Sequence, residues 1–241
     1  MAEPRRAQFT FLGHACVRCD LPDGRVLVVD PWLTGNPAAP KGVTFDRLDV
    51  ILVTHAHDDH MADVVPLAKR FDALVVAGYD LCGWIASQGV RRTSGMNIGG
   101  TQEIDGIRVT QVRADHTSSF IDGDGRIIYG GVATGFVVKL PGGCTFYHSG
   151  DTGLFSDMSL VGDLWRPEIA FLPIGNHFTM DPEQAARACR LTHVQWVIPI
   201  HHGTFPLLTG TPADLARALH DQGSPTRVVA LAPGESWSPP A

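Results

Sequence analysis

Residues 54–60 read Thr-His-Ala-His-Asp-Asp-His and directly follow the apolar run Val50-Ile51-Leu52-Val53. The apolar run predicts a buried strand, and the polar stretch predicts the turn in which that strand ends. Three imidazoles and a carboxylate so close together are more polar donors than packing requires, and they are the groups that bind zinc and related metals. The stretch therefore predicts one side of a metal site, with candidate ligands His55, His57, Asp59 and His60.

One turn cannot complete a coordination shell, and further donors follow other apolar runs. His116 comes after the run 107–112, Asp151 after 145–147, and the pair His201 and His202 after 197–200. Successive side chains on an extended segment diverge, so only one of the paired histidines should coordinate. The position directly after the strand favours His201, and His202 stays the alternative.

The order and type of these donors resemble those of the metallo-β-lactamase superfamily of binuclear metal hydrolases. The resemblance spans nearly the whole chain and implies that each ion has three ligands of its own and that Asp151 bridges the two. The implied ligands are His55, His57 and His116 for one ion and Asp59, His60 and His201 for the other.

Four shorter stretches resemble a group of small bacterial metal-dependent hydrolases akin to ascorbate-phosphate lactonase. These stretches are residues 11–15, 150–155, 177–180 and 201–206. In that group the residue after the last ligand is usually Tyr, so His202 departs from the pattern. Asp30, which precedes Pro31, matches the superfamily's first Asp, and the resemblance implies that it supports the ligand turn without binding metal.

The resemblance implies a hydrolase in which two divalent ions hold a bridging hydroxide as the nucleophile. Zinc is the expected metal, with manganese or iron as alternatives. The expected substrate is a small ester, lactone, amide or phosphodiester. Besides Asp59, the candidate catalytic residues are His14 and His177, which we expect to line the pocket without binding metal and to supply a proton. A nuclease or phosphodiesterase of the same fold, and a metal-binding protein without catalysis, remain alternatives.

Composition limits the partners of the chain. Hydrophobic residues make up 44% and charged residues 18% of the 241 positions, which is usual for a globular protein. A net charge of −6 disfavours nucleic acid as a partner. Since there is no membrane-length apolar stretch and no export signal, we expect a cytoplasmic protein with five free cysteines, no membrane partner and a small-molecule substrate. The sequence also allows a homo-oligomer.

The expected fold is a single α/β domain over residues 1–241, an αββα sandwich of two mixed sheets flanked by helices. The first strands, at 7–12, 15–20, 25–30 and 50–54, are expected to pair antiparallel. Further strands are expected at 73–77, 107–113, 134–140, 143–148, 168–172, 195–199 and 227–231. Helices are expected from residue 58 or 59 to 69 and at 80–88, 182–193 and 212–221.

Overall fold

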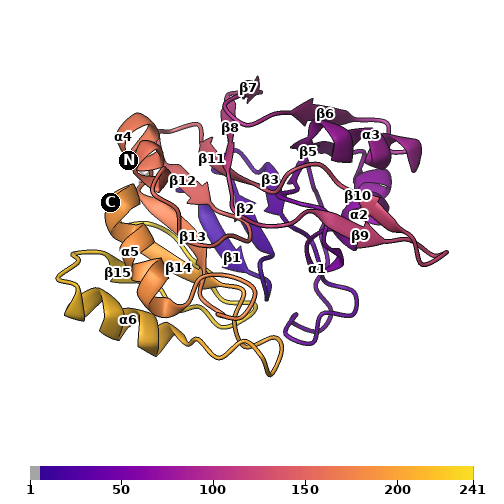
Figure 1. Ribbon diagram of the computed structural model, residues 1–241. Helices are drawn as coiled ribbons and strands as arrows, with labels where there is room; N and C mark the ends of the chain where they lie inside the picture. The colour runs from indigo at the N-terminus through magenta and orange to yellow at the C-terminus, as the bar shows by residue number, and fades with distance from the viewer. Residues whose placement is uncertain (1–5, 241) are drawn as a thin grey trace.

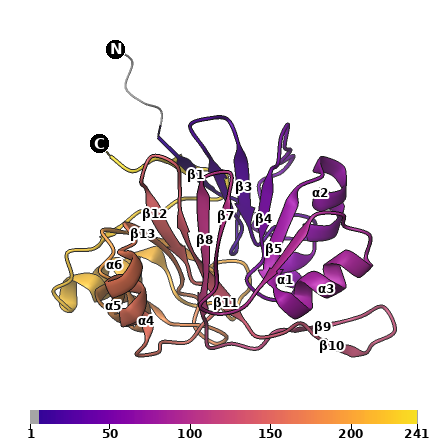
Figure 2. The ribbon, with the colours of Figure 1, turned by 90° about the horizontal axis from the view of Figure 1, so that it is seen from above.

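Two seven-stranded sheets pack face to face in the computed structural model, which describes residues 6–240 (Figures 1 and 2). The first sheet has the order β16-β1-β2-β3-β4-β5-β6, and its strands in chain order are β1 (Gln8–Phe11), β2 (Val17–Asp20), β3 (Val26–Val29), β4 (Val50–Leu52), β5 (Leu74–Gly78), β6 (Thr93–Met96) and β16 (Ser236–Trp237). The second has the order β15-β14-β13-β12-β11-β8-β7, and its strands are β7 (Thr101–Ile104), β8 (Ile107–Arg113), β11 (Thr134–Lys139), β12 (Thr145–His148), β13 (Ile169–Pro173), β14 (Trp196–Ile200) and β15 (Arg227–Val228).

Alternate residues of the central strands belong to different hydrophobic cores. On β3, Leu27 and Val29 face the core between the sheets, whereas Val26 and Val28 face the outer side of the first sheet. This follows from the two-residue period of a strand, and it explains why such strands are apolar throughout. The result is the expected four-layer αββα sandwich.

Helices cover the two outer faces (Figure 2). The first sheet is covered by α1 (Asp58–Met61), α2 (Val64–Phe71) and α3 (Tyr79–Ser87), and the second by α4 (Met158–Trp165), α5 (Pro182–Thr192) and α6 (Pro212–Asp221). In the part of the chain that the structure describes, no helix is both long enough and apolar enough to cross a bilayer.

The direction of the strands brings their ends to one edge of the sandwich. Strand β11 is antiparallel to both β8 and β12, so β8 and β12 run in the same direction. Strands β12, β13 and β14 are parallel to one another. The loops after β8, β12 and β14 therefore leave the second sheet at the same edge, where they meet the turn after β4.

The structure corrects several sequence-based expectations. In the first sheet β16, β1, β2 and β3 pair antiparallel, whereas β3 to β6 are parallel, so the strand expected at 50–54 does not pair antiparallel. The single helix expected from residue 58 or 59 to 69 is two helices, because the backbone N–H of Asp63 leaves the helical ladder and donates to the carbonyl of Pro31 at 3.0 Å. A third, two-stranded sheet was not expected: β9 (Ser119–Ile121) and β10 (Ile127–Tyr129) form a hairpin outside both large sheets (Figure 1).

Cys16 directly precedes β2, and Cys19 lies within it. Cys16 lies in the core on the helix side of the first sheet, and Cys19 lies in the core between the sheets. The two thiols therefore point to opposite faces and cannot act as a pair. All five cysteines are free.

Candidate metal centre

The turn after β4 is held by the buried carboxylate of Asp30. One oxygen accepts a hydrogen bond from the backbone N–H of Thr54 at 2.8 Å, and the other accepts from the Thr54 hydroxyl at 2.7 Å and from His60 Nδ1 at 2.8 Å. Asp30 itself has a left-handed backbone, with φ of 50°. These contacts confirm the prediction that Asp30 supports the ligand turn.

His55, His57 and His116 form a first cluster of donors. Their nearest ring nitrogens lie within 4.8 Å of one another, and His55 Nε2 is 3.0 Å from His57 Nδ1. A tetrahedral zinc ion with Zn–N bonds of about 2.0–2.1 Å would hold two nitrogens roughly 3.3 Å apart. The separation of the two imidazoles is therefore close to that of two ligands of one ion.

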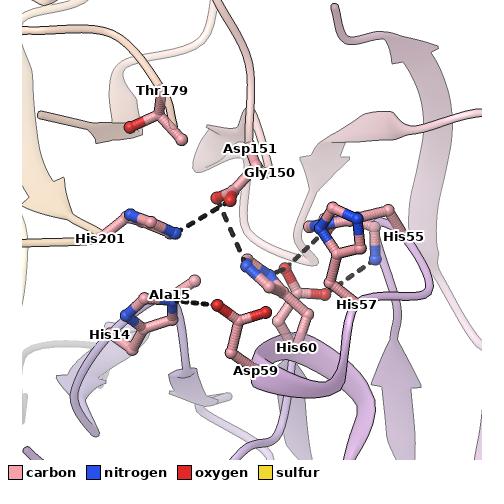
Figure 3. Close-up of polar contacts among 12 residues, drawn as sticks. His14, Ala15, His55, His57, Asp59, His60, Gly150, Asp151, Thr179 and His201 are labelled. Atoms are coloured by element: carbon pink, nitrogen blue, oxygen red, sulfur yellow. Dashed lines mark hydrogen bonds and ion pairs between the residues drawn. The ribbon is translucent and has the colours of Figure 1, made fainter. Parts of the chain in front are cut away.

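Asp59, His60 and His201 form a second cluster, together with His14. The residue His14 is fully buried, its ring centre is 4.0 Å from that of His201, and its Nε2 is 3.1 Å from Asp59 Oδ2 (Figure 3). On the other side of the ring, Nδ1 is 2.9 Å from the hydroxyl of Thr204. Both nitrogens of His14 are therefore engaged, which suits a residue that orients Asp59.

Asp151 lies between the two clusters (Figure 3). One carboxylate oxygen is 2.9 Å from His201 Nε2 and 3.7 Å from His116 Nε2, and the other is 3.4 Å from His60 Nε2. The residue before it, Gly150, is required by the packing of the loop, because a Cβ there would lie 2.7 Å from the Thr134 carbonyl oxygen and 2.8 Å from Thr54 Cβ. The loop after β12 thus sits directly on the turn after β4.

Ionisation of the cluster follows from burial and mutual charge. Burial lowers the pKa of His14 to about 4 and holds the pKa of His55 well below its usual value. Burial also acts to lower the pKa of His60, but the carboxylates of Asp151 and Asp30 outweigh it and raise that pKa. The pKa of Asp151 is held well below its usual value by His201 and His60 in spite of its burial.

The structure separates the paired histidines. The ring of His201 faces Asp151, whereas the ring of His202 stacks on Phe11 with centroids 6.0 Å apart and lies outside both donor clusters. His201 has a left-handed backbone, with φ of 52°, which turns the two successive side chains apart.

The remaining sequence-predicted residue, His177, is not brought to the clusters. Its side chain is exposed and packs edge-on against Phe178, with ring centroids 4.4 Å apart. Its role as a proton donor stays a prediction, as does that of His14.

A cleft of about 540 Å³ opens beside the donor clusters. His57, Asp58 and Asp59 form its polar side. Its remaining lining is largely apolar and consists of Trp32, Ala62, Ser119, Phe120, Ile121, Ile127 and Phe205. This volume falls within the range of small-molecule sites.

Apart from Asp30, sequence reasoning missed the residues that support the donors and those that wall the cleft. Thr54, Thr204 and Ser118 act through hydroxyl hydrogen bonds, which leave no pattern in a sequence. Trp32 and Phe205 come from distant loops and stack with centroids 5.9 Å apart. The one sequence feature that could have pointed to a supporting residue was the position of Thr54 directly before His55 in the 54–60 stretch.

The sequence profile described as the β-lactamase superfamily domain matches residues 24–202, which include all seven predicted ligands. The chain belongs to the metallo-β-lactamase superfamily. It is also 50% identical over 228 residues to a protein of Solibacter usitatus named UPF0173 metal-dependent hydrolase, an alignment that covers 95% of this chain and 98% of the relative. A protein of Methanopyrus kandleri with the same family name is 44% identical over 230 residues, with 95% and 99% covered.

Solved structures of the superfamily share the fold. Igni18, described as a novel metallo hydrolase from Ignicoccus hospitalis, is 31% identical and superposes with a TM-score of 0.85 over 98% of this chain and all of that one. The chain is thus a member of a family of metal-dependent hydrolases that covers nearly its whole length.

The donors of this superfamily member fit a metal centre on their own chemistry. His60 Nε2 and Asp151 Oδ1, which face each other at 3.4 Å, are buried side-chain atoms without a hydrogen-bond partner. Leaving such atoms unpaired costs free energy, so the site is built for a further group. Imidazole and carboxylate donors suit zinc, manganese or iron.

Proposed function

We propose that this protein is a binuclear metal-dependent hydrolase that cleaves a small ester, lactone or amide in the cleft beside the donor clusters. The observation that carries the proposal is the position of Asp151 between two groups of donors, within 2.9 to 3.7 Å of an imidazole from each. A carboxylate has two oxygens and can serve two ions at once. A site for a single ion would not need a buried carboxylate between two sets of imidazoles.

In this proposal His55, His57 and His116 hold one ion, and Asp59, His60 and His201 hold the other. When bound, two divalent ions lower the pKa of a coordinated water toward about 7 and polarise the oxygen of the scissile group. His201 is the proposed last ligand, because His202 lies against Phe11 outside both clusters.

The chain fixes the tautomers of its imidazoles. The hydroxyl of Thr54 donates its one proton to Asp30, so at 3.0 Å it accepts the Nδ1 proton of His55. That leaves the Nε2 lone pair of His55 directed at the first cluster. In the same way His60 donates its Nδ1 proton to Asp30, and its Nε2 faces Asp151. Such contacts orient the ligands of a metal before it binds.

The cleft favours a small molecule over a nucleic acid. No arginine or lysine is among the residues that line it, and Asp58 and Asp59 add negative charge. A nuclease or phosphodiesterase would have to bind its phosphate without a cationic side chain, so this alternative receives no support from the lining. The expectation of a cytoplasmic location remains part of the proposal, and cell fractionation tests it.

The test begins with protein stripped of metal by a chelator and reloaded with zinc, manganese or iron. Neutral p-nitrophenyl esters, a set of lactones, anilides and bis-p-nitrophenyl phosphate are the substrates. The proposal expects turnover of at least one ester, lactone or amide that is abolished by the chelator and restored by metal. His193→Ala, which removes an exposed imidazole, is the matched control and should retain activity. Tight metal binding with no turnover would favour the non-catalytic alternative.

A further inference from the structure

The hairpin of β9 and β10 carries apolar side chains on both of its faces. Phe120 and Ile128, which are cross-strand partners, face the body of the protein, and Phe120 packs on Trp84 of α3 with centroids 4.6 Å apart. Ile121 and Ile127 are the neighbouring cross-strand pair and are 64% and 76% exposed. The outer face of a two-stranded ribbon is normally polar, so this exposed pair indicates a surface that contacts something apolar.

The hairpin is anchored on the ligand turn itself. The hydroxyl of Ser118 accepts a hydrogen bond from the backbone N–H of Ala56 at 3.2 Å and donates to the carbonyl of Gly130 at 3.1 Å. Gly130 packs so closely that a Cβ there would overlap the side chain of Ala56. The hairpin therefore has a fixed position relative to His55 and His57, which flank Ala56.

The facing wall of the cleft is anchored on the second donor cluster. His14 contacts Trp32 and Phe205 edge-on, with ring centroids 5.1 and 5.7 Å apart. The two aromatic rings stack on each other and line the same cleft as Ile121 and Ile127. The donors thus lie at the polar side of a cleft that has Trp32 and Phe205 in one part of its lining and the hairpin residues Phe120, Ile121 and Ile127 in another.

We infer that these walls form a subsite for an uncharged, apolar group of several carbons next to the scissile bond, and that the exposed pair Ile121 and Ile127 selects the substrate. The inference rests on the proposed function and names its substrate class: neutral esters or amides with an extended apolar acyl group. A substrate with a negatively charged end is disfavoured, because the lining lacks arginine and lysine and contains Asp58 and Asp59. The arginine of the hairpin, Arg126, lies at its tip beside Asp124 and does not line the cleft.

A binding experiment tests the subsite without any turnover. The probe is N-phenyl-1-naphthylamine, a neutral dye whose fluorescence rises in apolar sites, titrated into metal-free protein. The wild type should bind it saturably, and the double variant Ile121→Ser, Ile127→Ser should bind it at least fivefold more weakly. The matched control is Ile98→Ser, Leu164→Ser, which removes two exposed apolar side chains outside the cleft and should bind like the wild type.

A kinetic experiment on metal-loaded protein tests the substrate class. For p-nitrophenyl acetate, butyrate and hexanoate, kcat/KM of the wild type should rise about two- to fourfold for each added methylene, as expected for its burial. The ratio of hexanoate to acetate should fall at least fivefold in the hairpin double variant and stay unchanged in the control. Mono-p-nitrophenyl adipate, which has the hexanoate chain length but a terminal carboxylate, should react at least tenfold more slowly than the hexanoate.

The outcomes separate the inference from the proposed function. An unchanged hexanoate-to-acetate ratio in the hairpin variant, or equal rates for hexanoate and adipate, would overturn the apolar subsite while the hydrolase stands. Saturable dye binding that the hairpin variant loses, combined with no turnover of any ester, would overturn the proposed function and leave the subsite standing.

Discussion

The seven proposed metal ligands come from two parts of the molecule that are built differently, and each part forms one side of the site. On one side, four donors come from the single turn 54–60, and one buried carboxylate, that of Asp30, holds the turn. On the other side, His116, Asp151 and His201 come from three loops after β8, β12 and β14. The first side needs only the neighbouring strands β3 and β4 to form, whereas the second needs the order and direction of an entire sheet.

The difference shows where each side is vulnerable. A contiguous turn depends on its local support, so a change in Asp30 should loosen several ligands at once. A set of ligands from separate strands is fixed by the sheet, so a change in one member should remain local. Asp151 is the exception, because it contacts imidazoles from both sides.

The largest effect is expected for Asp151→Ala. This change removes the carboxylate that lies between the clusters, so both proposed ions lose a ligand. We expect loss of at least one ion per chain and a fall in kcat of about 10³-fold or more, because the metals supply both Lewis acidity and an activated water. Elemental analysis and steady-state kinetics are the measurements. Two retained ions with normal turnover would show that the two ions do not share Asp151 as a ligand.

A smaller but still large effect is expected for Asp30→Ala. The residue is not a proposed ligand, yet its loss leaves the backbone N–H and hydroxyl of Thr54 and the Nδ1 proton of His60 without their acceptor. We expect metal affinity to fall about 10- to 100-fold and the free energy of unfolding to fall by about 3 kcal/mol. Metal titration and denaturant unfolding measure the two losses. If Asp115→Ala, an exposed carboxylate change, has equal effects, the support role of Asp30 is wrong.

A more modest effect is expected for His14→Ala. Because His14 is fully buried between Asp59 and Thr204, we expect it to orient Asp59 and expect kcat to fall about tenfold with two ions retained. The loss should be equal for esters with good and poor leaving groups, and His14→Gln should restore part of it. A loss confined to poor leaving groups would instead make His14 a proton donor, and the same comparison with His177→Ala tests that residue.

The smallest effect concerns pH and the turn before Asp151. His148 is fully buried, donates from Nε2 to the Ala15 carbonyl at 3.0 Å, and accepts at Nδ1 from the Gly150 backbone N–H at 3.2 Å. Burial lowers its pKa, so below about pH 6.5 the unfolded chain takes up a proton that the folded protein does not. Stability should therefore fall as the pH falls, by up to about 1.4 kcal/mol per pH unit from this residue.

The check is urea unfolding of metal-free protein between pH 7.5 and 5. The variant His148→Asn should be less stable at pH 7.5, and its stability should depend less steeply on pH below 6.5. Equal slopes for the variant and the wild type would mean that His148 is already protonated in the folded protein.

The sequence predicted local features better than distant ones. Helix α6 was predicted at its observed bounds, and α5 within one residue, because each begins with a capping side chain followed by proline. Helix α4, which has neither a side-chain cap nor a proline at its start, was missed. The break between α1 and α2 was missed because its cause is the hydrogen bond from the Asp63 backbone N–H to the carbonyl of Pro31, a residue distant in the sequence.

The same distinction holds for the site. The donors were predicted because strand ends and histidine spacing are visible in a sequence, and resemblance to the superfamily supplied their grouping. The walls of the cleft were not predicted, because Trp32, Phe205 and the β9–β10 hairpin are distant in the sequence and line one cleft only in the folded protein. The proposed substrate subsite is therefore the part of the account that required the structure.

The central claim, one binuclear centre shared by a local turn and three strand ends, is tested most directly by counting bound ions. Native mass spectrometry of stripped and reloaded wild-type protein should show two ions per chain. The matched variants His201→Phe and His202→Phe should show one and two ions, because only His201 faces Asp151. A single ion in the saturated wild type, or loss of an ion from His202→Phe but not from His201→Phe, would contradict the account.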